Sequence, residues 1–202
     1  MNYAKMMQYD TSNWEGITAT IFFSGCRFKC LGCFNPELHN FEYGKKFDKE
    51  AEKQFIKYAK NKHVDGICLL GGEVFQQDLD EVLDLVCKLR REVKKPIHVW
   101  SGYTFEELMK NEKAVLILHH IDTLVDGRFV YELKDLTLKY RGSSNQRVID
   151  VKKTLEAGEI VLIDCWKDWY LMSKKEKEAK ENKKYKKGNK KEKIVTRELH
   201  TL

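Results

Sequence analysis

Short apolar segments alternate with amphipathic ones along most of the chain, and this alternation constrains the fold more than any other feature. Segments rich in β-branched and aromatic residues predict strands at 16–25, 66–70, 96–100, 121–127, 147–155 and 159–164. An apolar spacing of three to four residues predicts helices at 47–62, 78–93, 104–111 and 113–119. Strands that alternate with helices build a mostly parallel sheet with right-handed crossovers. The sequence therefore predicts an α/β fold.

Two of the predicted helices carry start signals. Asp48, the second residue of the segment at 47–62, can act as the N-cap of its helix, because an Asp side chain can accept a hydrogen bond from a free backbone amide. Thr104 and Glu107 have the T-x-x-E spacing of a capping box. These signals support the helical assignment independently of the apolar pattern.

Four of the loops that follow predicted strands have an unusual composition. They are a cysteine-rich stretch, "SGCRFKCLGCFN" at 24–35, and the shorter stretches "GGE" at 71–73, "SGYT" at 101–104 and "VDGRF" at 125–129. In parallel sheets, ligands bind beyond the carboxyl ends of the strands, where such loops meet. We therefore expect the four loops to form one site.

Cys26, Cys30 and Cys33 are spaced C-x₃-C-x₂-C, and no fourth cysteine lies nearby in the sequence. A structural zinc ion and an ordinary iron–sulfur cluster each take four protein ligands. Three interpretations remain: unligated thiols, a zinc site with a histidine or a carboxylate as fourth ligand, or a [4Fe–4S] cluster with one iron open to another molecule. The candidate histidines for zinc are His39, His119 and His120. The cluster is favoured, since an open coordination position is where a substrate or cofactor binds.

An open iron could be chelated by the amine and carboxylate of an amino-acid-like molecule, and the "GGE" loop suits such a ligand. Gly71 and Gly72 allow a close approach of the backbone. Glu73 can accept a hydrogen bond from a bound ammonium group.

The remaining cysteines, the first ten residues and the short apolar runs predict a cytoplasmic protein. Cys68, Cys87 and Cys165 are scattered through apolar segments, where free cysteine behaves as a small buried side chain, so a disulfide scaffold is disfavoured. The first ten residues lack the apolar region of a secretory signal. The longest apolar runs are too short to span a bilayer.

The positive charge belongs to the end of the chain. Residues 173–193 hold eleven Lys and four Glu, a net charge of +7, so the rest of the 202-residue chain carries −1. We predict a domain at 1–172 and a basic, solvated or disordered tail at 173–202. A polybasic tail on a metal-stapled module also suggests a non-enzymatic protein that binds nucleic acid. Nucleic acid is disfavoured because the tail has a single Tyr and many Glu residues among its lysines.

The motifs together resemble a known family. C-x₃-C-x₂-C after the first strand and G-G-E after the second resemble the radical S-adenosylmethionine superfamily. "HVWSGYTFEEL" at 98–108, V-D-G-x-F at 125–129 and "RGSSNQR" at 141–147 resemble the glycyl-radical activases of anaerobic ribonucleoside-triphosphate reductases. The resemblance covers roughly residues 1–150. Activases of other glycyl-radical enzymes share the cysteine and G-G-E motifs and remain an alternative.

The resemblance implies a mechanism and a set of roles. Cys26, Cys30 and Cys33 would ligate a [4Fe–4S] cluster whose open iron binds S-adenosylmethionine. One electron from the reduced cluster would cleave the sulfonium, and the resulting 5′-deoxyadenosyl radical would take a hydrogen atom from a backbone glycine of the reductase. The cofactor-binding residues implied are Gly32, Cys33 and Phe34 at the adenine, Gly71, Gly72 and Glu73 at the methionyl amine, and Ser101, Tyr103 and Asp126 at the ribose or a cation.

The resemblance also implies a fold and partners. The chain has too few βα units for an eight-stranded barrel of about 250 residues, so an incomplete βα barrel is expected, open to the glycine-bearing subunit of the reductase. An electron donor such as a flavodoxin or ferredoxin would reduce the cluster. Asp126 could equally stabilise its own turn. Arg141 and Arg147 could dock the reductase, or the 141–147 loop could be ordered by its own hydrogen bonds.

Overall fold

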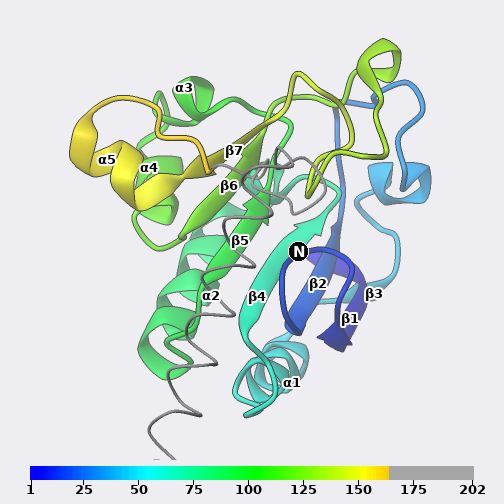
Figure 1. Ribbon diagram of the computed structural model, residues 1–202. Helices are drawn as coiled ribbons and strands as arrows, with labels where there is room; N and C mark the ends of the chain where they lie inside the picture. The colour runs from blue at the N-terminus through cyan, green and yellow to red at the C-terminus, as the bar shows by residue number, and fades with distance from the viewer. Residues whose placement is uncertain (164–202) are drawn as a thin grey trace, which may run out of the picture. The chain divides into compact units, whose positions relative to one another are not determined.

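The computed structural model describes residues 1–163, which are built on a seven-stranded sheet (Figure 1). The strand order is β3-β1-β2-β4-β5-β6-β7. The predicted basic tail from residue 173, the domain boundary at 172 and Cys165 lie outside the described residues. No helix within residues 1–163 combines the length and the apolar character that crossing a bilayer requires.

The centre of the sheet is parallel and its two margins are antiparallel. The parallel strands are β2 (Thr18–Ser24), β4 (Gly66–Gly71), β5 (Ile97–Trp100) and β6 (Thr123–Asp126). The antiparallel strands are β1 (Asn2–Asp10) beside β2, β3 (Lys45–Lys46) beside β1, and β7 (Arg147–Asp150) beside β6. The predicted α/β fold is confirmed, with a more mixed sheet than the sequence indicated.

Helices connect the parallel strands as predicted. The α-helices are α1 (Lys49–Ala59), α2 (Leu79–Glu92), α3 (Phe105–Leu108), α4 (Glu112–Leu118) and α5 (Val151–Ala157). The 3₁₀ turns are η1 (Pro36–His39), η2 (Val74–Gln76) and η3 (Tyr131–Leu133). Asp48 caps α1, and Thr104 and Glu107 form the predicted capping box of α3.

The main hydrophobic core lies between the sheet and the helices. Strand residues such as Ile21 and Leu69 are fully buried against Phe55 of α1, Leu85 of α2 and Ile117 of α4. Successive side chains of a strand point to opposite faces, so the alternate residues face away from these helices. Burial of this one face sets the register of the central strands.

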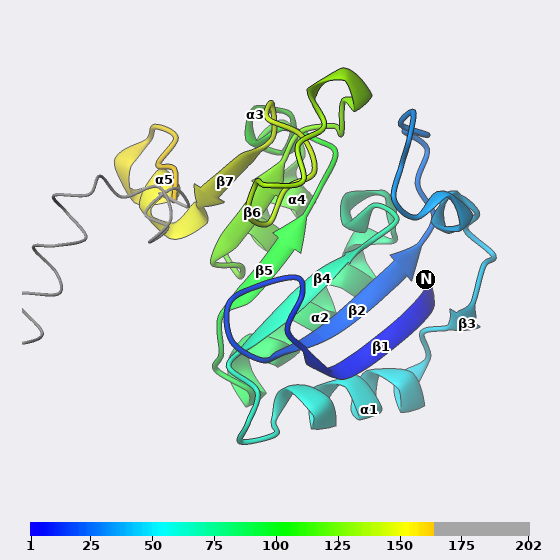
Figure 2. The same cartoon turned by 45° about the vertical axis from the view of Figure 1, so that its right-hand side comes forward.

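The loop between β1 and β2, drawn in dark blue in Figure 2, lies over part of the other face of the sheet. Trp14 of this loop stacks on His98 of β5, with ring centroids 4.1 Å apart, and on Tyr140, at 4.0 Å. His98 is 5% exposed. An aromatic stack therefore covers part of the face opposite the helices.

Strand β1 was missed by sequence reasoning, which left residues 1–15 unassigned. Its residues are only partly buried, and its pairing with β2 has two register irregularities, so no clean alternation marks it. The strand forms because β2 offers its free edge. The two-residue β3 is likewise defined only by its pairing with β1.

The predicted strands at 147–155 and 159–164 were partly wrong. β7 ends at Asp150, whose side chain accepts a hydrogen bond from the amide of Lys153 and so begins α5 at Val151. Gly158, with φ of 72°, ends that helix in the left-handed conformation. Within 159–163 only a single bridge forms, between Leu162 and Ile149. The β-branched residues at 148, 149 and 151 suggested one continuous strand, whereas the structure begins a helix at Val151 and buries that side chain in it.

Candidate cluster-binding site

The four strand-end loops meet at the carboxyl edge of the parallel strands, as predicted. The amide of Glu73 donates to the carbonyl of Gly25, which joins the second loop to the first. The Glu73 side chain reaches the third loop, and the amide of Gly127 in the fourth donates to the carbonyl of Tyr103 in the third, at 3.1 Å. Each of these hydrogen bonds joins segments that lie 24 to 48 residues apart, and together they link all four loops.

The cysteine loop is a tight turn held by unusual backbone conformations. The amide of Cys33 donates to the carbonyl of Cys30 at 3.1 Å, which brings the second and third cysteines onto one turn. Lys29 and Gly32 both have positive φ, 50° and 68°. A Cβ on Gly32 would lie 2.4 Å from the ring of Tyr131, so both its φ and its surroundings require glycine here.

The three loop cysteines are free and half-buried, consistent with thiols available for a ligand. Burial raises the pKa of Cys26 and of Cys30, and the neighbouring Cys33 raises that of Cys30 further. Because only a thiolate ligates metal, iron binding here would release protons. Outside the loop, Cys68 is buried as expected, whereas Cys87 on α2 is half-exposed.

Two phenylalanines anchor the cysteine loop to its neighbours. Phe28, between the first two cysteines, packs edge-on against Tyr103 at 4.7 Å and lies 4.4 Å from the guanidinium of Arg128. Phe34, after the third cysteine, packs against Phe129 at 5.2 Å. Such aromatic and cation–π contacts each contribute about 0.5–1.5 kcal/mol. The loop is therefore fixed at both ends.

Glu73 is the central polar group of the site. Its carboxylate accepts hydrogen bonds from the hydroxyl of Ser101 at 2.8 Å and from the amides of Gly102 and Phe75 at 2.6 and 3.0 Å. The side chain is 1% exposed, and burial raises its pKa to about 7 although the three hydrogen bonds oppose the shift. Glu73 and Ser101, both predicted cofactor contacts, thus bind each other and join two loops.

Gly71 and Gly72 are required by backbone packing. A Cβ on Gly71 would lie 2.5 Å from the carbonyl oxygen of Phe23, and one on Gly72 would lie 2.6 Å from that of Gly25. The amide of Gly72 donates to the Phe23 carbonyl at 2.7 Å. Both glycines let the end of β4 approach the end of β2, and their contact with a cofactor stays a prediction.

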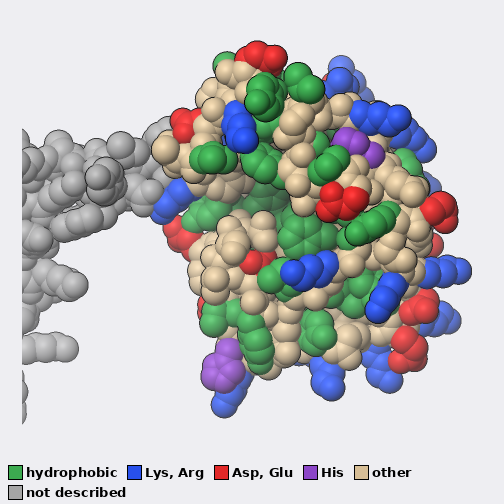
Figure 3. Space-filling model, turned by 90° about the vertical axis from the view of Figure 1, so that its right-hand side faces the viewer, with side chains coloured by type: hydrophobic (Ala, Val, Ile, Leu, Met, Phe, Trp, Pro, Cys, Tyr) green, Lys and Arg blue, Asp and Glu red, His purple; other side chains and the backbone are tan. Residues whose placement is uncertain are grey.

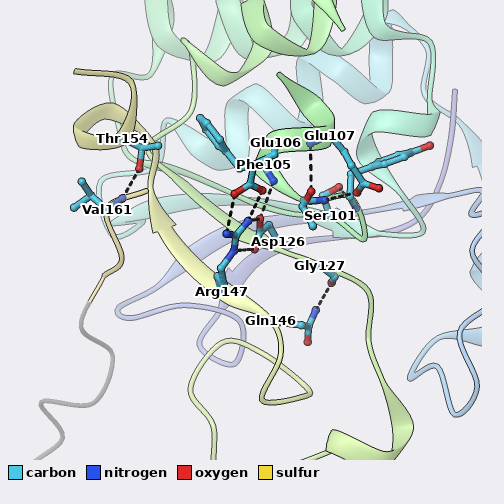
Figure 4. Close-up of polar contacts among 12 residues, drawn as sticks. Ser101, Phe105, Glu106, Glu107, Asp126, Gly127, Gln146, Arg147, Thr154 and Val161 are labelled. Carbon is cyan, nitrogen blue, oxygen red and sulfur yellow. Dashed lines mark hydrogen bonds and ion pairs between the residues drawn. The ribbon is translucent and has the colours of Figure 1, made fainter. Parts of the chain in front are cut away.

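Asp126 lies in an ion-pair network, shown in Figure 4. Its carboxylate is 1% exposed and accepts hydrogen bonds from Arg147, at 2.5 and 3.0 Å, and from the amide of Phe105 at 2.8 Å. Arg147 also binds Glu106 at 2.7 Å and lowers the pKa of that carboxyl to about 2. Asp126 therefore fixes the start of α3, and its predicted contact with ribose or a cation is untested.

Hydrogen bonds within the 141–147 loop order it, one of the two alternatives raised by its sequence. The side-chain oxygen of Gln146 accepts from the amides of Gly142 and Ser143, and its NH₂ group donates to the carbonyl of Gly127 at 2.9 Å. Arg141 donates to the carbonyl of Gln146 at 2.6 Å. The loop is thereby tied to the V-D-G-x-F segment (Figure 4).

The donor set fits an iron–sulfur cluster better than zinc. Of the candidate zinc ligands, His119 and His120 follow α4 and precede β6, which places them at the opposite edge of the sheet from the cysteines. His39, at the end of η1, lies beside the cysteine loop, and its carbonyl accepts a hydrogen bond from the amide of Cys26 at 3.3 Å. Within residues 1–163, no three His, Cys, Asp or Glu side chains are grouped to hold one metal ion. A [4Fe–4S] cluster has a different requirement, since each cysteine binds a separate iron.

A buried polar atom beside the cysteine loop also points to a bound group. The hydroxyl of Ser24, two residues before Cys26, is fully buried and has no hydrogen-bond partner among the described residues. Ser24 lies on the strand face that points away from the helices. Buried polar groups are nearly always paired, so an unpaired hydroxyl here fits a site built for another molecule.

The surroundings of the cysteine loop are partly apolar and exposed. Leu31 is 71% exposed and Phe34 54%, and Tyr131, adjacent to Gly32, is 51% exposed. Figure 3 shows one face of the molecule on which hydrophobic side chains gather near the centre and most charged side chains lie toward the margin.

Comparison with known proteins agrees with this site. The family model described as "4Fe-4S single cluster domain" matches residues 12–149, which include all three loop cysteines and the strand-end loops. The match and the three-thiol loop define the chain as an iron–sulfur protein with a single [4Fe–4S] cluster domain.

Curated relatives identify the family more closely. The anaerobic ribonucleoside-triphosphate reductase-activating protein of Haemophilus influenzae is 38% identical over 150 residues, covering 72% of this chain and 96% of the relative. The Escherichia coli K12 protein of that name is 39% identical over 152 residues, covering 73% and 97%. That of phage T4 is 31% identical over 150 residues, covering 73% and 93%. The chain belongs to the family of anaerobic ribonucleoside-triphosphate reductase-activating proteins.

Proposed function

We propose that this chain cleaves S-adenosylmethionine reductively and uses the product to install a glycyl radical on an anaerobic ribonucleoside-triphosphate reductase. The observation that carries the proposal is the three-cysteine loop at the carboxyl edge of the parallel strands, tied to the buried Glu73. Three thiols leave one iron of a [4Fe–4S] cluster free for the cofactor. Membership of the activating-protein family supports the choice of reductase.

The roles proposed for the protein's own groups follow from their positions. Cys26, Cys30 and Cys33 hold the cluster as thiolates. When bound, the cluster would supply the single electron needed to break the sulfonium bond of S-adenosylmethionine, which would give methionine and the 5′-deoxyadenosyl radical that takes the glycine hydrogen. The protein binds and orients the cofactor and excludes water.

The cofactor contacts implied by the family resemblance stay part of the proposal. The backbone around Gly32 and Phe34 would meet the adenine, and Gly71 to Glu73 would meet the methionyl amine. Ser101 and Asp126 would act near the ribose, and both already lie at the edge of the site through their contacts with Glu73 and Phe105.

The open sheet supports access by a protein substrate. Its end strands, β3 and β7, are not paired with each other, in keeping with an incomplete barrel of the radical S-adenosylmethionine type. A flexible segment of the reductase that carries the glycine could reach the carboxyl edge through such an opening. A flavodoxin or ferredoxin is proposed as the electron donor.

The test is anaerobic reconstitution with iron and sulfide, followed by reduction and addition of S-adenosylmethionine. We expect 5′-deoxyadenosine by chromatography and a change in the EPR signal of the reduced cluster when the cofactor binds. Cys30→Ala should abolish both. Cys87→Ala, which removes a half-exposed thiol on α2, is the matched control and should retain both.

Two outcomes would reject the proposal. One is uptake of zinc without cluster formation, which would favour a structural-metal module. The other is cluster formation without deoxyadenosine. If both activities appear, the target is tested by EPR detection of a glycyl radical on the reductase, and a radical on a different glycyl-radical enzyme would redirect the assignment.

A further inference from the structure

We propose that Tyr103 is a positioning residue that holds the segment between the first two cysteines, and so sets how firmly the loop retains its cluster. The inference rests on the proposed function, because it concerns the cluster that the loop would hold. Tyr103 stands in the "SGYT" loop after β5 and is partly buried against the core.

Tyr103 reaches the cysteine loop in two independent ways. Its ring packs edge-on against Phe28, with centroids 4.7 Å apart and planes at 68°. Its hydroxyl accepts a hydrogen bond from the NH₂ group of Gln76 at 3.3 Å, and the side-chain oxygen of Gln76 accepts from the amide of Arg27 at 2.6 Å. One side chain thus acts on both Arg27 and Phe28.

Arg27 and Phe28 lie between two cluster-binding cysteines, so contacts with them affect the cysteines. Arg27 and Phe28 follow Cys26 directly and precede Cys30 by only a few residues. Any shift of this segment therefore moves the two sulfur atoms relative to each other. Residues that orient metal ligands without touching the metal typically change metal affinity by 10- to 100-fold when they are replaced.

Tyr103 is itself held from two other directions. Its amide donates to the hydroxyl of Ser101 at 3.0 Å, and its carbonyl accepts from the amide of Gly127 at 3.1 Å. Ser101 in turn binds the buried Glu73. Tyr103 therefore connects the cysteine loop to the other three strand-end loops. Such a connection suits a residue that must hold metal ligands in a fixed geometry.

The experiment measures retention of the cluster. Reconstituted wild-type protein and variants are mixed anaerobically with an iron chelator, and cluster loss is followed by absorbance. We expect Tyr103→Leu, which removes the ring and the hydroxyl, to speed iron loss by 10- to 100-fold. Tyr103→Phe keeps the ring contact and should show a smaller effect. The EPR spectrum of the reduced cluster should change in Tyr103→Leu.

A matched control separates positioning from general destabilisation. Tyr58 on α1 is also a partly buried tyrosine packed on the core, and Tyr58→Leu should leave iron retention within about twofold of wild type. The double variant Phe28→Leu with Tyr103→Leu tests the route through Phe28. If Tyr103 acts mainly through that ring, the rate of iron loss in the double variant should stay within about threefold of the rate in the faster single variant.

Several results would overturn the inference. They are wild-type retention in Tyr103→Leu, an equal loss in Tyr58→Leu, or effects of Phe28→Leu and Tyr103→Leu that multiply in the double variant while Gln76→Met retains iron like the wild type, because that combination excludes both routes. If Tyr103→Leu does not fold, iron retention in Tyr103→Phe and Gln76→Met is compared with that of the wild type, because each variant removes the hydrogen-bonded link between Tyr103 and Arg27. Wild-type retention in both variants would then overturn the inference. Failure of the wild-type protein itself to take up a cluster would reject the proposed function instead.

Discussion

His98 should make the stability of the iron-free protein depend on pH in a way that one substitution removes. Its ring is 5% exposed, stacks on Trp14, and its Nδ1 has no hydrogen-bond partner among residues 1–163. Burial lowers the pKa of His98 from 6.5 to about 4; Asp122 opposes the shift and Arg90 adds to it. The folded protein therefore holds this histidine neutral where the unfolded chain protonates it.

The magnitude follows from linkage. Between pH 6.5 and pH 4 the unfolded chain binds a proton that the folded state does not, so the free energy of unfolding falls as the pH falls. Each pKa unit is worth 1.36 kcal/mol, so the full loss is about 3 kcal/mol and is complete below pH 4. Above pH 6.5 the group has no such effect.

Glu73 also makes the free energy of unfolding depend on pH, over nearly the same pH range as His98 but in the opposite direction. Because its pKa is raised to about 7, the folded state keeps a proton that the unfolded chain has lost, and stability falls as the pH rises from 4.5 to 7. The two dependences oppose each other, and the wild-type profile should be shallow over the range where both groups titrate. His98→Phe removes only the first of them.

The assay is denaturant unfolding of iron-free wild-type protein and His98→Phe between pH 4 and pH 7.5. We expect the difference between the two free energies to change by about 3 kcal/mol across this range, with His98→Phe relatively more stable at low pH. Phenylalanine keeps a ring against Trp14 and cannot take a proton. A difference that is constant with pH would refute the reasoning.

Three further substitutions test the network around the site. Asp126→Ala leaves Arg147 without its buried partner, and denaturant unfolding should show a free energy of unfolding lower by about 3 kcal/mol. A decrease of less than about 1 kcal/mol would mean that the ion pair is not held as described. Trp14→Ala removes the aromatic stack and should cost about 3 kcal/mol by the same assay, unless the neighbouring rings collapse into the space. Gly102→Ala places a Cβ 2.5 Å from the Phe28 ring, so chelator-driven iron loss should accelerate about tenfold, and unchanged retention would show that the ring moves freely aside.

The central βαβ order could be predicted from the sequence because its signals are local. The helices α1 and α2 are marked by apolar periodicity, and Asp48, Thr104 and Glu107 cap helices as their spacing indicates. The meeting of the four strand-end loops also followed from sequence order, since the carboxyl ends of parallel strands lie at one edge.

Other elements depend on partners that are distant in the chain. β1 exists because β2 has a free edge, and α5 replaces the second half of a predicted strand because Asp150 caps it. Apolar patterning alone cannot separate such cases, because a buried valine such as Val151 is compatible with a strand or with a helix.

The sequence by itself determined the ligand chemistry of this protein. Three thiols in eight residues and a glycine-rich acidic turn are local patterns, and their side-chain types restrict the groups that they can bind. Only the tertiary structure decided the partners of the surrounding side chains: Ser101 with Glu73, Arg147 with Asp126, and Tyr103 with the segment between two cysteines. These contacts join residues more than twenty positions apart, and their geometry is set when the sheet and its loops pack.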